Sequence, residues 1–355
     1  MTGLVITAVG AVTSVGLDAV TTCASIRAGL SRPSVIEEFQ VLDIEEFATT
    51  GVMGYPIEML ARGFSGVGRW AQLAVAAVED LCRSRGLPDA TDDDYWRNTR
   101  WILVVPEIDV TRFPFGPGCN PNQLESTLLA TLRERLAKVC VIHGVEVLDS
   151  GRRGFFEAIS RAQCEIDAGC RRFVVVAMDS LVDAASLAWL NDDGRLKQDG
   201  NPVGLMPGEA SVALMVEQAA IAEATALGRL GPSVVEEGGV DGLRDAIHRI
   251  LEELDEHSAL VVIVDQNGEP WMSEGYGRVC VGLPWSGSAP EWSSVVPSVG
   301  DVGAAAPALQ AIVACARLGR TECGGGMITF LDFDGACGAM AVRGGGECRG
   351  HIQRT

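Results

Sequence analysis

The sequence predicts an α/β protein whose strands form a largely parallel sheet covered by helices, in two related halves. Short apolar runs rich in β-branched residues alternate with longer segments of helical periodicity, which is typical of such a sheet. This series of strands and helices occurs twice along the 355 residues. Hydrophobic residues make up 47% of the chain and charged residues 21%, the composition of a folded protein with a large core.

The expected strands fall into two groups along the chain. Those of the first half are 4–11, 101–106, 139–148, 173–177 and 210–216, and those of the second are 259–264, 278–281, 327–331 and 339–343. An amphipathic helix is expected over 69–83, because Trp70, Leu73 and Ala77 share one helical face.

The expected boundary between the halves lies near residue 230. The alanine-rich segment 217–230 ends at Gly231 and Pro232, a pair that usually breaks regular structure. We therefore predict an N-terminal half over 1–230 and a C-terminal half over 231–355. Segments 107–121 and 283–297 are rich in Pro, Gly and Ser without periodicity, which predicts loops that line a surface or a pocket.

Charge and cysteine content exclude several classes of protein. The net charge of −19 would repel nucleic acid and anionic lipid, so neither is an expected partner. The eleven cysteines are an odd number without a CxxC pair, which favours a reducing compartment. The N-terminus lacks a basic signal-peptide region, and no apolar run reaches the ~20 residues that span a bilayer. We expect a cytoplasmic protein.

Neither a metal nor a cofactor is expected. The four histidines have no ligand-like spacing to each other or to cysteine pairs. No GxSxG motif is present, so a serine hydrolase of the α/β type has no support.

Five segments, in order, resemble the β-ketoacyl synthases of the thiolase superfamily. They are 4–16 (LVITAVGAVTSVG) with the helix that ends at 26–29, 173–181 (FVVVAMDSL), 190–192 with 204–211 (GLMPGEAS), 300–305 (GDVGAA), and 331–338 (LDFDGACG). The fourth segment reads G-H-x-x-G-A-A in the family, and the fifth parallels the family's F-G-F-G-G-T-N-G turn. The resemblance implies a thiolase-like five-layered α/β/α/β/α fold. It also implies a dimer that pairs through a first-half strand, here 139–148.

The positions that carry the family's chemistry are occupied by other residues. Ketosynthases need a cysteine at a helix N-terminus, where the helix dipole lowers the thiol pKa. The resemblance places Arg152 there, and a guanidinium cannot attack a thioester. The family's two histidines correspond to Gln266 and Asp301, and its lysine to Pro297 or Ser298. Phe333 lies in the segment that parallels the family's turn between the two closing strands. The five vestigial active-site positions are therefore Arg152, Gln266, Pro297, Asp301 and Phe333, and we predict no catalytic residue.

Two questions stay open about these positions. Cys119 and Cys337 are the cysteines expected near the pocket mouth, and buried or incidental thiols are the favoured interpretation of both. Arg152 and Arg153, together with Asp301, either form an internal ion pair that fills the vestigial active-site pocket or bind an anion. The ion pair is favoured, because a buried charge needs a partner.

The leading functional hypothesis is a non-catalytic ketosynthase-like protein that acts as a partner subunit or as an assembly or adaptor factor. Its sequence is also similar to ketosynthase-like proteins of Gram-negative bacteria, some of them associated with type VI secretion. A second hypothesis is a chain-length factor, an inactive subunit that pairs with an active ketosynthase. A third is acyl-thioester binding or acyl transfer by an unorthodox cysteine. The expected partner is thus a protein, in a homodimer or in a heterodimer with a ketosynthase-like chain.

Overall fold

The computed structural model describes residues 4–43, 47–113, 121–222, 225–254, 260–283, 290–319 and 325–345. Its main feature is a ten-stranded sheet in the order β10-β9-β11-β12-β8-β1-β7-β6-β4-β5. The strands of its first half are β1 (Leu4–Thr13), β4 (Thr99–Val104), β5 (Val145–Leu148), β6 (Arg172–Ser180) and β7 (Glu209–Gln218). Those of its second half are β8 (Gly228–Glu237), β9 (Leu260–Val264), β10 (Glu291–Ser294), β11 (Gly325–Leu331) and β12 (Ala336–Gly344).

The two halves of the sheet repeat one topology. The first half has the order β1-β7-β6-β4-β5, and the second the order β8-β12-β11-β9-β10, which is the same order of strands counted within each half. In both, the first two pairings are antiparallel and the last two are parallel. A short antiparallel pairing of β1 with β8, over Leu4–Ile6 and 228–230, joins them. The predicted duplication is therefore confirmed.

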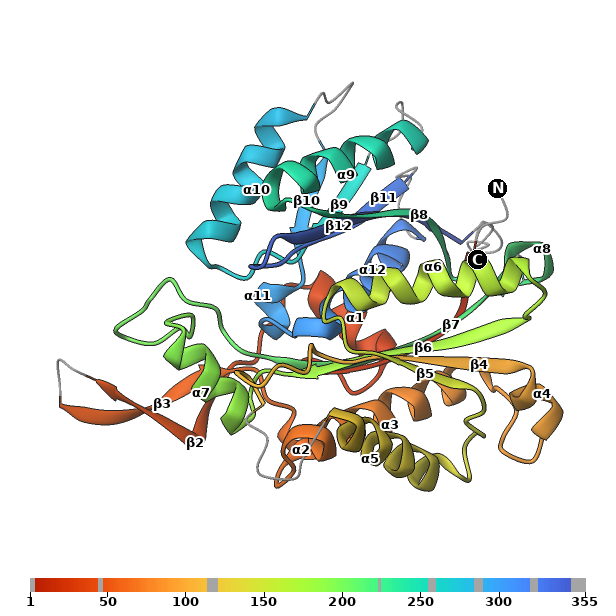
Figure 1. Cartoon of the computed structure of the whole chain (residues 1–355), viewed down its shortest axis with the longest axis horizontal. Coiled ribbons are helices and arrows are strands. Elements are labelled where there is room, and N and C mark those ends of the chain that lie inside the picture. Colours follow the sequence, from red (N-terminus) through yellow and green to blue (C-terminus); the bar gives the residue numbers. More distant parts are fainter. Residues whose placement is uncertain are drawn as a thin grey trace, which may run out of the picture.

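Helices form three layers around the two halves of the sheet (Figure 1). The helices α3 (Gly66–Arg85) and α5 (Pro121–Leu136) cover the outer face of the first half, and α9 (Gly239–Glu253) and α10 (Pro270–Gly282) cover the outer face of the second. Between them lie α1 (Ala19–Arg27), α6 (Arg153–Asp167) and α12 (Ala306–Leu318). Both α6 and α12 contact strands of both halves, and α12 is accordingly buried almost throughout. This is the predicted five-layered α/β/α/β/α arrangement.

The remaining elements are short or peripheral. They are α2 (Glu58–Ala61), α4 (Asp93–Arg97), α7 (Ala184–Asp192), α8 (Ala219–Ala222), α11 (Val296–Val299) and a 3₁₀ turn over Gly303–Ala305. The strands β2 (Ser34–Asp43) and β3 (Ala48–Gly54) form a separate two-stranded sheet. In the part of the chain that the structure describes, no helix is long and apolar enough to span a membrane.

Two predicted strands need correction. Residues 278–281 belong to α10, where Met272, Tyr276 and Val279 are buried at helical spacing; the short apolar run alone does not distinguish the two structures. In the predicted strand 139–148, only Val145–Leu148 is extended. Val139 belongs to the turn that follows α5, where its N–H donates to the carbonyl of Leu136, and residues 140–144 are irregular, with Gly144 at φ +53°.

The predicted break at residue 230 does not interrupt a strand. Gly231 and Pro232 lie inside β8, between Leu230, which pairs with Val342 of β12, and Ser233, which pairs with Met340, where the register shifts. A bulge of this kind accommodates a proline, because the ladder bond that proline cannot donate is already absent there. The division into halves at 230 stays a prediction. The helix expected over 69–83 is confirmed as part of α3.

Candidate functional site

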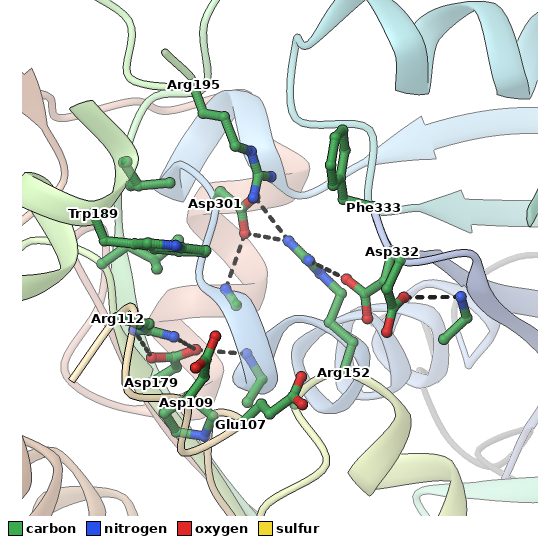
Figure 2. A pocket seen from close by; sticks show the side chains of 18 of the residues that line it. Glu107, Asp109, Arg112, Arg152, Asp179, Trp189, Arg195, Asp301, Asp332 and Phe333 are labelled. Atoms are coloured by element: carbon green, nitrogen blue, oxygen red, sulfur yellow. Dashed lines mark hydrogen bonds and ion pairs between the residues drawn. The ribbon is translucent and has the colours of Figure 1, made fainter. Parts of the chain in front are cut away.

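A cavity of about 380 Å³ opens where the ends of strands from both halves meet the start of α6 (Figure 2). Its lining contains seven carboxylates and four guanidinium groups: Glu107, Asp109, Asp179, Asp193, Asp301, Asp332, Asp334, Arg112, Arg152, Arg153 and Arg195. The described part of the predicted loop 107–121 contributes Glu107, Asp109 and Arg112. Residues 114–120 lie outside the described ranges, as do 284–289 of the second predicted loop.

Arg152 occupies the N-cap of α6 and reaches across the cavity to the second half of the chain (Figure 2). Its Nη2 donates to both oxygens of Asp301 at 2.6 and 2.7 Å, and its Nη1 donates to Asp332 at 2.6 Å. A third carboxylate, that of Asp265, lies 3.4 Å from Nε. The predicted internal ion pair between Arg152 and Asp301 is thus present. Arg153 also lines the cavity but does not take part in this cluster, because it pairs with Glu157 and Glu237.

Sequence and topology explain why these three acids meet. Asp265 directly follows β9 and Asp332 directly follows β11, and these two strands are parallel neighbours. Their carboxyl ends therefore lie at the same edge of the sheet. Asp301 is fixed by its backbone, since its N–H donates to Met206 and its carbonyl accepts from Gly208, both at 2.8 Å.

The carboxylates in this cluster differ in their affinity for protons. Burial raises the pKa of Asp265 to about 7, although Arg152 and a hydrogen bond from Tyr276 oppose the shift. Burial also raises the pKa of Asp332. Burial acts in the same direction on Asp301, but Arg152, Asn267 and the N–H of Gly303 outweigh it and lower its pKa. Asp301 is therefore the permanent anion that faces Arg152, and the other two acids take up protons more readily.

A second set of polar contacts continues from Asp301. The amide of Asn267 donates to Asp301 at 2.9 Å and to Glu269 at 2.8 Å. Glu269 in turn accepts two hydrogen bonds from Arg195, at 2.9 and 2.8 Å. Gln266 does not join this network: its side chain is exposed and donates to Ser273. The residue that faces the cluster is thus Asn267, one position beyond the residue expected from the sequence.

The floor of the cavity holds another buried ion pair. Arg112 donates to Asp179 at 2.6 and 3.3 Å and to the carbonyl of Ser180 at 3.0 Å. Asp179 also accepts from the N–H of Ala304 at 2.9 Å. Gly303 must be glycine here, because a Cβ atom would lie 2.0 Å from Asp179 Oδ2 and because φ is +51°. The glycine loop 300–305 is therefore anchored to the end of β6.

Aromatic side chains flank the cavity beside Arg195. The guanidinium of Arg195 stands 5.5 Å from the ring centroids of both Trp189 and Phe333. Phe333 is largely exposed and packs edge-on against Trp271 at 5.6 Å. The predicted position Phe333 therefore does line the cavity. Pro297 lies apart from it, in α11, where its carbonyl accepts from the hydroxyl of Tyr55.

No thiol faces the cavity among the described residues. The described residues of its lining include no cysteine, histidine or lysine. They include one serine, Ser150, whose hydroxyl donates to Glu157. Cys337 is fully buried, and burial together with Glu236 and Glu237 raises the pKa of its thiol to about 12. Cys119 lies outside the described residues. No group of side chains suited to a metal ion occurs within these ranges either.

The fold was compared with solved structures. An ishigamide ketosynthase/chain length factor matches with a TM-score of 0.73 and 16% identity, over 97% of this chain and 99% of that one. A β-ketoacyl synthase from Burkholderia phymatum STM815 matches with a TM-score of 0.70 and 15% identity, over 97% and 99%. A chain of a type II polyketide synthase complex, in which an acyl-carrier protein is bound to its ketosynthase, matches with a TM-score of 0.76 and 12% identity, over 97% and 99%.

This chain has a ketosynthase fold. Each match covers nearly the full length of both chains, which confirms the fold that the sequence resemblance implies. No protein-family model matches the chain, and no curated protein matches it.

Sequence reasoning found Arg152 and Asp301 but missed Asp265, Asp332 and Asn267. For the two aspartates a signal was available, because each follows an apolar strand directly and a buried arginine needs acidic partners. Arg112 and its pairing with Asp179 had no such signal, since Arg112 lies in a loop without periodicity.

Proposed function

We propose that this protein is a non-catalytic ketosynthase-like subunit that acts through contact with another protein, as a partner subunit or an assembly factor. The observation that carries the proposal is the pairing of Arg152 with carboxylates inside the cavity. At the helix start where the resemblance expects a nucleophilic thiol, a guanidinium is held by carboxylates of the second half. Such a cluster supplies neither a nucleophile nor a base next to one.

The charge of the cavity supports the same proposal. A condensing enzyme stabilises a developing oxyanion with preorganised donors. Here the donors of Arg152, Arg112 and Arg195 are already engaged by Asp301, Asp332, Asp179 and Glu269. The rim adds Glu107, whose pKa is raised by burial and by nearby Asp334 and Asp109. Uncompensated acids at the entrance oppose the binding of a thioester whose carrier arm bears a phosphate.

Intact mass spectrometry tests the absence of acyl transfer. The protein is incubated with acyl-CoA and, separately, with an acyl-carrier protein bearing the same acyl group, next to an active ketosynthase as positive control. We expect the mass of this chain to stay unchanged while the control gains the acyl group. An adduct that peptide mapping places on a cysteine would refute the proposal and support transfer by an unorthodox thiol.

A chain-length-factor role is the second candidate, favoured by the similarity to an ishigamide ketosynthase/chain length factor. The strand β5 ends the sheet, and its outer side has no strand neighbour among the described residues. We propose that a dimer partner pairs there. This candidate predicts a stable heterodimer when the chain is co-expressed with a cysteine-bearing ketosynthase from the same cells, and size-exclusion chromatography showing two separate species would contradict it.

A link to type VI secretion is the more specific form of the adaptor proposal, and it rests on the similarity of sequence segments. Affinity purification of the tagged full chain from its native cells tests it. Recovery of a secretion component or effector is the expected result, and recovery of neither would remove the link while leaving the partner-subunit proposal in place.

A further inference from the structure

The strands β2 and β3 form an arm, residues 34–43 and 47–54, that projects from the body beside α7 (Figure 1). One face of the arm is packed: Ile36, Val41 and Val52 belong to a hydrophobic cluster with Leu187 and Leu190 of α7. The arm is thereby held in a fixed orientation on the body. Among the described residues, no such cluster covers its opposite face.

The uncovered face carries apolar side chains in register. Val35 and Met53 are directly opposite each other, and Leu42, opposite Thr49, lies further out on the same face. Leu42 is 65% exposed, and Phe47, directly before β3, is 86% exposed. Phe47 also has φ +52°, the one positive φ among the non-glycine residues that the structure describes, and this conformation is uncommon for a bulky residue. Water-facing apolar side chains gathered on one projecting ribbon are typical of a contact surface.

The charge of the arm is of one sign. The sequence of the arm, 34–43 and 47–54, includes Glu37, Glu38 and Asp43, but no lysine, arginine or histidine. Glu37 and Glu38 lie at the bulge in β2, where the register shifts between Ile36 and Gln40. Neither forms an ion pair with a residue in the described ranges. The arm therefore offers apolar contacts together with negative charge, of which Glu38 interacts electrostatically with Arg69 of the body.

A cavity of about 260 Å³ lies at the base of the arm. Glu37, Glu38 and Glu58 line it, together with apolar side chains such as Val182. Arg69 also borders it, where it donates to Glu209 at 2.5 and 2.8 Å and interacts electrostatically with Glu38, so that Arg62 and Arg69 face three carboxylates. Its size and net negative charge fit the long cationic side chain of an approaching protein.

We propose that the arm is the docking surface for a positively charged, apolar segment of a different protein. This inference rests on the proposed partner-subunit function and names the surface and the chemistry of the partner. A second copy of this chain is the wrong occupant, because the chain carries a net charge of −19 and an arm without cations, so like charges would meet. A basic partner gains from both the apolar face and the carboxylates.

A binding assay on the full chain tests the chemistry. The probe is a fluorescent peptide of alternating leucine and arginine, about seven residues long to match a strand, with a leucine–glutamate peptide as its counterpart. We expect the arginine peptide to bind and the glutamate peptide not to bind. Leu42→Ser, and separately Glu37→Gln with Glu38→Gln, should each weaken binding about tenfold.

Matched variants elsewhere control for general attraction to an acidic protein. Val281→Ser removes an apolar side chain that is 89% exposed on α10, and Glu252→Gln with Glu253→Gln neutralises two exposed acids on α9. Both should change binding by less than about twofold. An equal loss in the arm variants and in these controls would overturn the proposal, as would tight binding of the glutamate peptide.

Photo-crosslinking in native cells tests the location. A crosslinking amino acid replaces Leu42 or, as control, Val281, and the crosslinked peptide of the partner is sequenced. The expected result is a segment rich in arginine or lysine with apolar residues, captured from position 42 only. Capture of a second copy, of an acidic segment, or of the partner only through position 281 would reject the arm as the docking surface. Capture only through position 281 would leave the partner-subunit function in place. The acyl-adduct experiment tests that function independently.

Discussion

Replacing Arg152 by methionine tests whether the ion cluster holds the two halves together. The side chain of Arg152 is 11% exposed, and it is the cation shared by Asp301, Asp332 and Asp265. Removing one partner of a buried ion pair costs about 3–5 kcal/mol, because the remaining charge stays buried without compensation. Methionine keeps much of the side-chain volume, so the loss reports the charge and not a large cavity.

Protonation of the acids that are left without a cation limits this loss of stability. The pKa values of Asp265 and Asp332 are raised by burial even with Arg152 present, and without the guanidinium both rise further. At pH 7.5 we expect Arg152→Met to lower the free energy of unfolding by about 3 kcal/mol. At pH 5.5 the acids are neutral in a larger fraction of molecules, so the loss should be smaller.

Urea unfolding followed by the fluorescence of the seven tryptophans measures both values. Arg153→Met is the matched control, since the side chain of Arg153 is 38% exposed and pairs with Glu157 and Glu237. This variant should lower the free energy of unfolding by about 1 kcal/mol or less. Adding Asp301→Asn and Asp332→Asn to Arg152→Met should recover a large part of the loss. If Arg152→Met proved no more destabilising than Arg153→Met, the ion cluster would not stabilise the contact between the two halves.

Three further changes probe the same site. Because burial raises the pKa of Asp265 to about 7 from 3.8, the folded protein keeps a proton that the unfolded chain releases, and the stability that this group contributes falls as pH rises from about 4 to 7. Asp265→Asn should flatten the dependence of the melting temperature on pH over that window, removing on the order of 4 kcal/mol of pH dependence. An unchanged profile would contradict the assignment. Gly303→Ala places a Cβ against the Asp179 carboxylate at a positive φ, and thermal unfolding should show a loss of about 2–4 kcal/mol. Arg152→Cys should not create a reactive nucleophile, because Asp301 and its neighbours disfavour a thiolate; alkylation by iodoacetamide at pH 7.5 faster than that of free cysteine would show the reverse.

The fold was accessible from the sequence because its signals are long and repeated. Most predicted strands of the large sheet are extended in the structure, and the duplicated series corresponds to two halves with the same strand order. The strands β8 and β10 and the arm were missed, because their runs are interrupted by glycine, proline or charged residues. Tertiary pairing, not local pattern, keeps these segments extended.

The site was accessible only in part, since a loop position cannot be read to the nearest residue from a motif. Gln266 and Asn267 are both amides, and only the structure shows that the side chain of Asn267 turns toward Asp301 while that of Gln266 turns to Ser273. Arg152 was found because a helix start fixes its place in space more firmly than a loop does. The same reasoning did not reach Pro297, whose side of α11 faces Tyr55.

The departures at the site are physically coupled and not independent losses. Arg152 without Asp301 would be a buried cation at the positive end of a helix dipole, and Asp301 without Arg152 would be a buried anion. Each therefore stabilises the other, and a change at one position alone lowers stability. A protein that retained weak condensing activity would need to keep a thiol and its base, whereas this cluster favours a rigid junction between two halves of the fold. A rigid junction of this kind is consistent with the proposed partner-subunit function, in which the surface of the protein and not its cavity would engage the partner.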